Sequence, residues 1–419
     1  MATMNIAVSS DFNSSSIPEI WQKTVQHVAD RMSIISRLKG SESSDAPVLE
    51  KEDLTKQAGD TIRYVIYNRL LGKGVTGETA LQNSEEKLTN AADVVTVALF
   101  RHATAFNKFA AKVVLGDLEA IAARNIGEWL GRFLDDNFTD QVLNQDTPTI
   151  LYGGDATARA NLGPGDICSA SFFKRLHMAA QRRGVQPWQT SGKARMPFPV
   201  YGALVNEIDY YNLVVSDDFE QDVRLAAERG KSNPALDGNM DMYNGVVIYR
   251  WSSVNPGDGM VGSYLRPEAR LAANINSSTT TITAGPTSAV TNVDYWQYFP
   301  TSGSNTLLIG SEQIAYTGTP GDSSLTVDTR GANGSTAAAH TAGDLITLNN
   351  VGKVLLFGRH TAMQAWAQKP QRIKQDYDFD YERGRGIDFI YEVKGIEAGD
   401  ATLANCVVGE VYSPNPNTI

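Results

Sequence analysis

The chain has 419 residues and a formal net charge of -10, with 37 basic and 47 acidic residues. A chain of this length can bury a large core and is expected to divide into roughly two or three domains. The acidic balance argues against a dedicated nucleic-acid binder, because phosphates are repelled unless a basic face is segregated. The most basic cluster, which we interpret as the solvated face of a helix, comprises Lys174, Arg175, Arg182 and Arg183.

Cysteine usage and hydropathy indicate in which cellular compartment the protein folds. Cys168 and Cys406 are isolated from each other, so the sequence offers neither a disulfide framework nor a zinc-type spacing. No apolar run approaches the ~20 residues that a bilayer-spanning helix needs, and the N-terminus lacks a basic region followed by a hydrophobic one. We therefore expect a soluble, unexported protein with no membrane partner.

The first fifty residues are predicted to form an arm. A polar, Ser-rich opening precedes a helical pattern over 17–38, and linker-like composition follows it. Such a short helix between polar stretches cannot bury its apolar face alone, so it must dock on another domain or another subunit. The residues expected to make an intersubunit contact lie at helical steps and are Trp21, Val25, Val28, Met32 and Ile35.

Residues 60–71 and 93–101 are rich in β-branched and aromatic residues, and the segment between them is polar and punctuated by glycine. This pattern predicts an extended hairpin with a charged tip. Loops of this length are uncommon and usually functional, so we expect the tip to reach a partner, although a disordered surface loop stays open. The predicted intersubunit contacts are Lys73, Glu78, Glu85, Glu86 and Lys87.

A long amphipathic helix is predicted over 115–143, where polar residues including Asp135 take the face opposite an apolar stripe. We interpret it as a strut, with an ordinary core helix of a globular enzyme as the alternative. Gly127 and Gly131 lower the local helix propensity and make a bend or a close crossing plausible. The stripe consists of Leu118, Ala122, Ile126, Trp129 and Phe133.

The second half of the chain is predicted to be a second α/β domain interrupted by a β module. Helices are expected over 166–184 and 218–229, with strands from the apolar runs in 198–216 and 244–254. From about 271 to 350 lysine vanishes, and short strands alternate with Gly, Ser and Thr, which indicates a small all-β module. The host domain then resumes with a strand running into a helix at 354–367.

The sequence predicts no enzyme, no cofactor and no metal. The five histidines fall in different elements, and the HExxH, GxSxG, P-loop and CxxC patterns are absent. Carboxylates alternate with aromatic residues from Asp376 to Glu382, and on one strand they could hold a divalent cation. The favoured alternative is an acidic sheet edge that meets Arg383 and Arg385 or a neighbouring subunit. The four carboxylates are those of Asp376, Asp378, Asp380 and Glu382.

Several segments together carry a resemblance to a known family. They are GDTIRYVIYNRLLGKGVTGETALQNSEEKL, Arg101-His102, AAERGKSNPALDGNMDMYNGVVIYRWSSV, VLLFGRHTAMQAWA and GRGIDFIYEVKGI. With the arm, the hairpin and the strut, they resemble the HK-97 fold of tailed-phage major capsid proteins. More specifically, they resemble the family typified by the major capsid protein of coliphage N-four. The segment 271–350 is extra and is similar to a small β module that recurs in phage structural proteins.

The resemblance implies an α+β, HK-97-like capsid fold. Its parts would be an N-terminal arm (1–50), an extended loop (51–105), a peripheral domain with a spine helix (106–164), an axial domain (165–270), an inserted all-β surface domain (271–350) and a return to the peripheral and axial domains (351–419). The insert, with five acidic residues against Arg330 alone over 274–349, is expected to face outward, away from packaged DNA.

The implied function is that of a major capsid protein, which self-assembles as hexamers and pentamers into an icosahedral shell around double-stranded DNA. The implied partners are other copies of the chain, portal and scaffold or cement proteins, and packaged DNA through non-specific contacts with the inner surface. The protein would be assembled in the bacterial host cytoplasm and reside in the virion capsid. An encapsulin-like compartment shell and a carbohydrate- or receptor-binding protein remain as alternatives.

Overall fold

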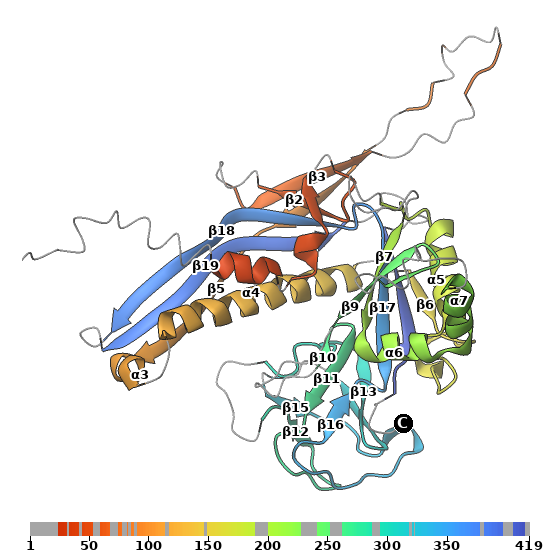
Figure 1. Ribbon diagram of the computed structural model, residues 1–419. Helices are drawn as coiled ribbons and strands as arrows, with labels where there is room; N and C mark the ends of the chain where they lie inside the picture. Colours follow the sequence, from red (N-terminus) through yellow and green to blue (C-terminus); the bar gives the residue numbers. More distant parts are fainter. Residues whose placement is uncertain are drawn as a thin grey trace, which may run out of the picture. The chain divides into compact units, whose positions relative to one another are not determined.

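The computed structural model divides into two compact units, one formed by residues 1–145 and 359–403 and the other by residues 146–358 and 404–419. Each unit therefore contains segments from distant parts of the sequence (Figure 1). The residues that the structure describes are 24–31, 33–41, 44–52, 59–67, 74–77, 82, 85–87, 90–113, 117–145, 149–188, 200–227, 241–251, 262–286, 294–317, 321, 323–377, 381–396 and 405–414.

The described strands of the first unit include a five-stranded sheet in the order β1-β2-β18-β19-β5. The two short strands from the arm region run parallel to each other and to β18, whereas β18, β19 and β5 are antiparallel. The bounds are β1 (Lys39–Ser41), β2 (Val48–Lys51), β5 (Ala98–Asn107), β18 (Ala362–Tyr377) and β19 (Glu382–Gly395).

The helix predicted within 354–367 is wrong, because this stretch ends β17 (Val351–Phe357) and begins β18. An apolar run of this length suits a buried strand as well as a helix, and periodicity alone cannot separate the two. The tertiary context decides: β18 hydrogen-bonds to β2 on one side and to β19 on the other, so its backbone groups are paired in the centre of a sheet.

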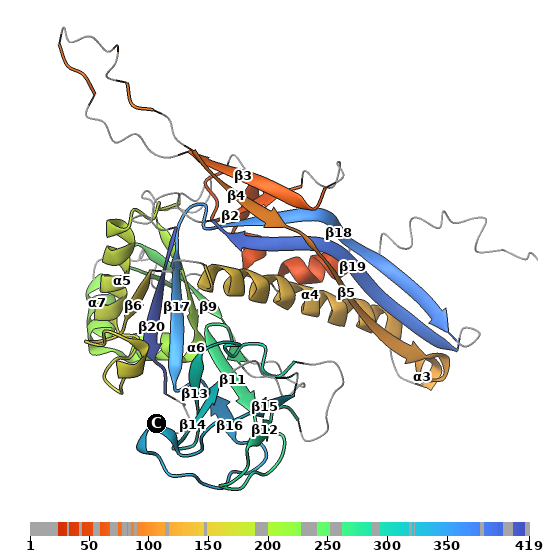
Figure 2. The ribbon, with the colours of Figure 1, turned by 180° about the vertical axis from the view of Figure 1, so that it is seen from behind.

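The predicted long helix is present as α4 (Leu118–Leu143). The Asp117 side chain begins it by accepting hydrogen bonds from the backbone N–H groups of Glu119 and Ala120, as an N-cap residue does. The helix packs against β19 and β5 of the sheet and against the short 3-10 helix η1 (Ile35–Arg37) of the arm. Figure 2 shows α4 running along the sheet. The short helix α3 (Lys108–Val113) directly follows β5.

The predicted extended hairpin is also present. β3 (Thr61–Tyr67) pairs in antiparallel register with β4 (Asn90–Thr96), from the Thr61–Thr96 pair to the Tyr67–Asn90 pair. Its base packs on the five-stranded sheet, because Ile62 and Val95 are buried in one cluster with residues of β2 and β18. The hairpin is therefore anchored at its base, and its strands lead away from the anchor towards the tip.

The described strands of the second unit include a six-stranded sheet in the order β6-β20-β17-β7-β9-β8. Apolar side chains of α5 and of strands β7, β9, β17 and β20 form its core. The bounds are β6 (Ile150–Tyr152), η3 (Arg159–Asn161), α5 (Ala170–Arg182), β7 (Tyr201–Asn206), α6 (Glu207–Val215), α7 (Asp217–Ala227), β8 (Asp241–Tyr243), β9 (Val246–Trp251) and β20 (Cys406–Tyr412).

The helices and strands predicted for the second α/β domain are present, except that part of one predicted strand is a helix. Residues 207–215 form α6 because the Asn206 side chain caps it, accepting hydrogen bonds from the N–H groups of Ile208 and Asp209. The apolar run that ends at Val215 suggested a strand, yet only Asn212 and Leu213 of its last residues are buried. A one-sided burial of this kind is typical of a helix on the surface of a sheet.

The described residues between 262 and 348 consist mainly of short strands and turns, and their division into a separate all-β domain at 271–350 stays a prediction. They form a five-stranded sheet in the order β10-β11-β16-β13-β14 and a two-stranded sheet of β12 and β15, around a cluster of buried apolar side chains. The bounds are β10 (Gly262–Ser263), β11 (Arg266–Arg270), β12 (Thr281–Thr283), β13 (Ser304–Ile309), β14 (Glu312–Thr317), β15 (Ser324–Thr326), η5 (Ala332–Gly334) and β16 (Leu345–Thr347).

Candidate assembly surfaces

The hairpin presents charged residues beyond its anchored base. Glu85, Glu86 and Lys87 are exposed, whereas Lys73 and Glu78 lie outside the described residues. At the base, Lys394 of β19 forms an ion pair with Asp93 of β4, which adds a polar contact to the apolar anchor. The contact of these exposed side chains with a neighbouring subunit stays a prediction.

The arm docks on the spine helix α4 of its own chain. Val25 and Ile35 are buried and Val28 is half-buried. A methyl group on Gly127 would lie 2.8 Å from the Val25 carbonyl oxygen, so only glycine permits this close approach. Val25 and Ile35 thus fill an intrachain core, which revises our assignment of them to a neighbour. Trp21 and Met32 lie outside the described residues, and the arm's intersubunit role stays a prediction.

Asp135 fixes the arm to α4, because the arm covers the helix face opposite the apolar stripe at this position. The side chain is only 5% exposed. Its carboxylate accepts hydrogen bonds from Ser33 Oγ at 2.6 Å, Ile34 N at 2.9 Å and Ile35 N at 3.1 Å. Burial raises the pKa of Asp135 to about 6, although these hydrogen bonds act in the opposite direction. Asp135 follows Gly127 and Gly131 at steps of four, a spacing that places all three on one helix face.

The predicted stripe of α4 is one of two faces of the helix that pack within the first unit. Ala122 and Ile126 are buried, whereas Leu118, Trp129 and Phe133 are half-buried. The Trp129 ring stacks on His102 at 4.3 Å, and the Phe133 ring lies 4.8 Å from that of Phe100 and 5.6 Å from that of Phe389. The stripe therefore covers the sheet of its own unit, while the face with Gly127 receives the arm.

The end of the first unit that carries α3 exposes large apolar side chains, which the sequence analysis did not identify. Phe109 and Val113 are 67% and 64% exposed, and Tyr377 and Tyr381 are 49% and 46% exposed. Lys108 N donates a 2.7 Å hydrogen bond to Tyr381 O, which joins α3 to the β18–β19 end. We call these four residues the distal patch. A clustered apolar surface of this kind is typical of an interaction site.

The acidic stretch that follows β18 does not form one strand face. Asp376 belongs to β18 and Glu382 to β19, and the pairing of Tyr377 with Glu382 places them on opposite arms of a hairpin. Asp378 and Asp380 lie outside the described residues. Asp376 accepts a 2.6 Å hydrogen bond from Arg385 Nη1, which lowers the pKa of this carboxyl. Asp376 therefore meets an arginine, as the favoured alternative predicted.

The described part of the chain contains no group of three or more His, Cys, Asp or Glu side chains placed to hold a metal ion. Within the same residues, no helix combines the length and the apolar character that crossing a membrane requires.

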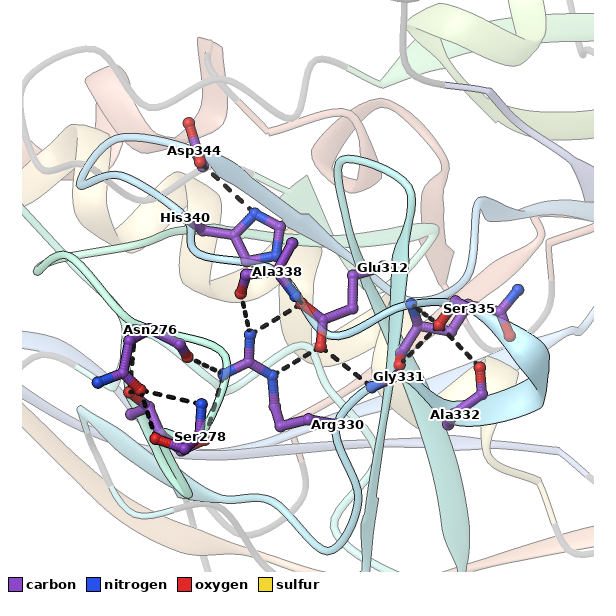
Figure 3. Close-up of polar contacts among 12 residues, drawn as sticks. Asn276, Ser278, Glu312, Arg330, Gly331, Ala332, Ser335, Ala338, His340 and Asp344 are labelled. Atoms are coloured by element: carbon purple, nitrogen blue, oxygen red, sulfur yellow. Dashed lines mark hydrogen bonds and ion pairs between the residues drawn. The ribbon is translucent and has the colours of Figure 1, made fainter.

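In the β module, one buried carboxylate joins several loops (Figure 3). Glu312 is 1% exposed and accepts hydrogen bonds from Arg330 Nε at 2.7 Å and Arg330 Nη2 at 2.8 Å. It also accepts from Gly331 N at 3.1 Å, Ala338 N at 3.0 Å and His340 Nε2 at 2.8 Å. Burial alone would raise its pKa, but the bonds from Arg330, Ala338 and His340 outweigh burial and lower the pKa to about 2.

The aromatic cluster of the β module lies inside its core. Tyr295, Trp296, Tyr298 and Phe299 are all less than 7% exposed, and the rings of Trp296 and Phe299 meet edge to face at 5.1 Å. Adjacent aromatic residues on a polar module can be interface anchors, but packing inside the module's own core is at least as compatible with the sequence. The rings pack inside the core, so they are not available to a neighbouring subunit.

Comparisons with known proteins agree with this architecture. Residues 12–149 match the model of a family described as phage capsid protein, and no curated protein matches. The capsid of Ralstonia phage GP4 is 17% identical with a TM-score of 0.59 and 92% of each chain covered. The cyanophage Pam1 capsid is 18% identical, with a TM-score of 0.55, and the match covers 91% of this chain and 93% of that one. The capsid of Helicobacter pylori bacteriophage KHP30 is 12% identical, with a TM-score of 0.56 and 91% of each chain covered.

At these low identities, the TM-scores and the coverage establish a shared fold. They confirm the mixed α+β capsid fold that the sequence predicted, over more than nine tenths of the chain. The chain therefore has the fold of phage capsid proteins, and its residues 12–149 carry the sequence pattern of the phage capsid protein family.

Proposed function

We propose that the protein is the major capsid protein of a tailed bacteriophage and resides in the virion head. It is a structural subunit and not an enzyme, and it assembles with copies of itself into an icosahedral shell. The observation that carries this proposal is the agreement in fold with phage capsid chains over 92% of both chains, joined to the family match at 12–149. A fold by itself does not specify a function, so the proposal also depends on the surfaces that the subunit exposes.

The finer features of assembly follow as part of the same proposal. The chain forms hexamers and pentamers in the host cytoplasm and encloses double-stranded DNA, with portal and scaffold or cement proteins as further partners. Within phage capsid proteins, the quoted sequence segments favour relatives of the coliphage N-four coat protein. The net charge of -10 means that contacts with DNA on the inner surface would be non-specific and local.

Two surfaces of the first unit are proposed to contact neighbouring subunits. The hairpin tip carries Glu85, Glu86 and Lys87 in exposed positions, with Lys73 and Glu78 close by in sequence. The distal patch exposes two aromatic rings of the β18–β19 end and two apolar side chains of α3. Individual surface ion pairs contribute only about 0–1 kcal/mol, but a closed shell repeats every contact, so small contributions decide assembly.

The domain division proposed from the resemblance places an all-β domain at 271–350, on the outside of the shell. Its own apolar core supports an independent domain. Its ends also support an insertion, because Leu271 N donates to Asp344 O at 2.9 Å and Gly343 N donates to Leu271 O at 2.7 Å. A module whose ends lie this close can interrupt a host domain without disturbing it.

Electron microscopy of the purified full-length chain tests the proposal. The wild-type chain should form closed particles, and the Phe109→Asp, Tyr381→Asp double variant should remain a folded subunit, because two charges would prevent apolar burial of the distal patch. Met178→Asp, at a residue of α5 that is 52% exposed, is the matched control and should still assemble. A wild-type chain that remains a monomer under assembly conditions would argue against a shell protein.

A further inference from the structure

Three charged side chains are buried together where β11 meets the six-stranded sheet of the second unit. Arg266 and Glu268 belong to β11 and are 2% and 5% exposed, and Asp209 of α6 is fully buried. Two carboxyl groups thus share one guanidinium group. If all three were ionised, the site would carry a net negative charge away from solvent, which is unfavourable without further compensation.

Hydrogen bonds make this cluster a link between three elements. Arg266 Nη1 donates to Ser413 O at 3.0 Å and to Ser413 Oγ at 2.9 Å, just after β20. Arg266 Nε forms an ion pair with Glu268 Oε1 at 2.5 Å, and Asn206 Nδ2 donates a hydrogen bond to Asp209 Oδ2. Compensation is nevertheless incomplete, because four buried atoms have no hydrogen-bond partner among the described residues: Arg266 Nε and Nη2, Glu268 Oε1 and Asp209 Oδ1.

The surroundings leave little room for relaxation. A methyl group on Gly352 of β17 would lie 2.1 Å from Asp209 Oδ2 and 2.8 Å from Ser413 Cβ, so the sheet backbone closes one side of the carboxyl group. A packed site with two acids and one base can lower its charge most easily by holding a proton on one carboxyl group. The unpartnered Oδ1 of Asp209 is a suitable place for that proton.

The other ionisable groups around the cluster are Glu207, Arg270 and Cys168. Burial raises the pKa of Asp209 to about 7, against the effects of Ser413, Arg266 and Asn206. Burial also raises the pKa of Glu268, where Arg266 and Arg270 act in the opposite direction and Glu207 in the same direction. The Cys168 thiol stays neutral, because burial and the nearby Asp209 raise its pKa.

We infer that Asp209, Arg266 and Glu268 form a proton-dependent contact between β11 and the six-stranded sheet. This contact is stable when one carboxyl group holds a proton and weakens when both carboxyl groups are ionised. Because β11 pairs with β16, and β16 with β13, weakening of this contact would allow the β module that follows to separate from the sheet. The inference concerns the subunit alone and does not depend on the proposed capsid function.

The direction of the effect follows from linkage. An acid whose pKa is higher in the closed state than in the open state favours the closed state at low pH. The opening equilibrium constant should therefore rise as the pH increases from the ordinary carboxyl range near pH 4 to about 7, by up to about tenfold per pH unit, and should level off above that.

Hydrogen exchange of β11 amides in the full-length chain tests this, with opening constants corrected for the intrinsic pH dependence of exchange. From pH 5 to 7, the wild-type opening constant should rise at least tenfold more than that of Asp209→Asn, whose amide cannot ionise. Asp217→Asn, at an exposed position, is the matched control and should behave as wild type.

Glu268→Gln provides a second variant if Asp209→Asn does not fold. It removes one of the two acids, so Asp209 should then ionise at lower pH beside Arg266, and the rise in the opening constant should shift to lower pH. Equal pH dependence of β11 exchange in the wild-type chain and in whichever of these variants folds would overturn the inference.

Discussion

Among single residues, Glu312 accepts five hydrogen bonds in the β module, and its removal should be costly. Glu312→Gln keeps the size of the side chain but leaves the Arg330 guanidinium, whose side chain is 7% exposed, without a counter-charge. Removing one partner of a buried pair costs about 3–5 kcal/mol. We expect the thermal transition of the module to shift to lower temperature in this variant, as followed by circular dichroism. Asp328→Asn, at an exposed position of the same module, should leave that transition unchanged.

The same residue predicts how the module responds to acid. The pKa of Glu312 is lowered to about 2 from an ordinary value of 4.5, so its contribution to stability is present above pH 4.5 and is lost as the pH falls towards 2. The wild-type module should therefore melt at progressively lower temperature between pH 4.5 and pH 2.5. Glu312→Gln should show a weaker decline, and an equal decline in both proteins would contradict the assignment.

For single residues, the sequence indicated which side chains are unusual but did not indicate which side chains they contact. It identified Arg330 as the only strong base of the module but not its pairing with Glu312, because the two meet only after β14 and the following loops fold. Asp135 was assigned to the face opposite the stripe, but helical periodicity does not show that the arm covers this face. Its true partners, which include Ser33 and Ile34, lie about a hundred residues away and could not be inferred from local spacing.

Among the elements, α4 depends on a glycine for its contact with the arm. Gly127→Ala would place a methyl group 2.8 Å from both the Val25 carbonyl oxygen and Val28 Cβ. The gain in helix propensity is about 1 kcal/mol, whereas forcing extra volume into a packed contact costs about 1–3 kcal/mol. We expect lower stability in urea and faster hydrogen exchange over 24–38.

The matched control for this variant is Gly165→Ala, where an added methyl group would meet no atom within 4 Å. A change of less than about 0.5 kcal/mol is expected there. If Gly127→Ala left exchange over 24–38 as slow as in the wild type, the arm would not depend on this close approach.

The hairpin tip should act through its charge. Reversing Glu85 and Glu86 to lysine should lower the yield of closed particles and change its dependence on salt, because exposed ion pairs are screened by ions. The measurement is light scattering during assembly at several ionic strengths. Asp155→Lys with Asp328→Lys reverses two exposed charges elsewhere and should assemble normally. Identical assembly of the two double variants would mean that the tip is not a contact.

The sequence specified elements where the local signals agreed. The apolar stripe predicted α4, which the structure begins after the Asp117 cap, and the β-branched runs predicted the β3–β4 pair. It failed at 207–215 and 354–367, where short apolar runs suit either a helix or a strand and the outcome is decided by capping or by neighbouring strands. The distal patch was missed because α3 has six residues, too few for periodicity to reveal an exposed face.

For the whole molecule, the β module is expected to be dispensable for shell closure, since its aromatic rings are used in its own core. The deletion should remove residues 272–342 and join the ends with a short Gly-Ser linker, because Leu271 and Gly343 are hydrogen-bonded neighbours. We expect closed particles of unchanged shell diameter. The same linker inserted at the exposed Gly303 is the control. Failure of the deletion alone to close would assign the module to a contact between subunits.

The central claim is that this chain builds the shell of a phage head, and cryo-electron microscopy of phage particles from the host that carries its gene tests it most directly. The reconstruction should show a closed icosahedral shell around nucleic acid, with each subunit traced by α4, the β3–β4 hairpin and the six-stranded sheet, and with residues 271–350 on the outer surface. A shell built from a different chain, with this one in the tail or absent, would contradict the account, and closed shells filled with protein would indicate a compartment.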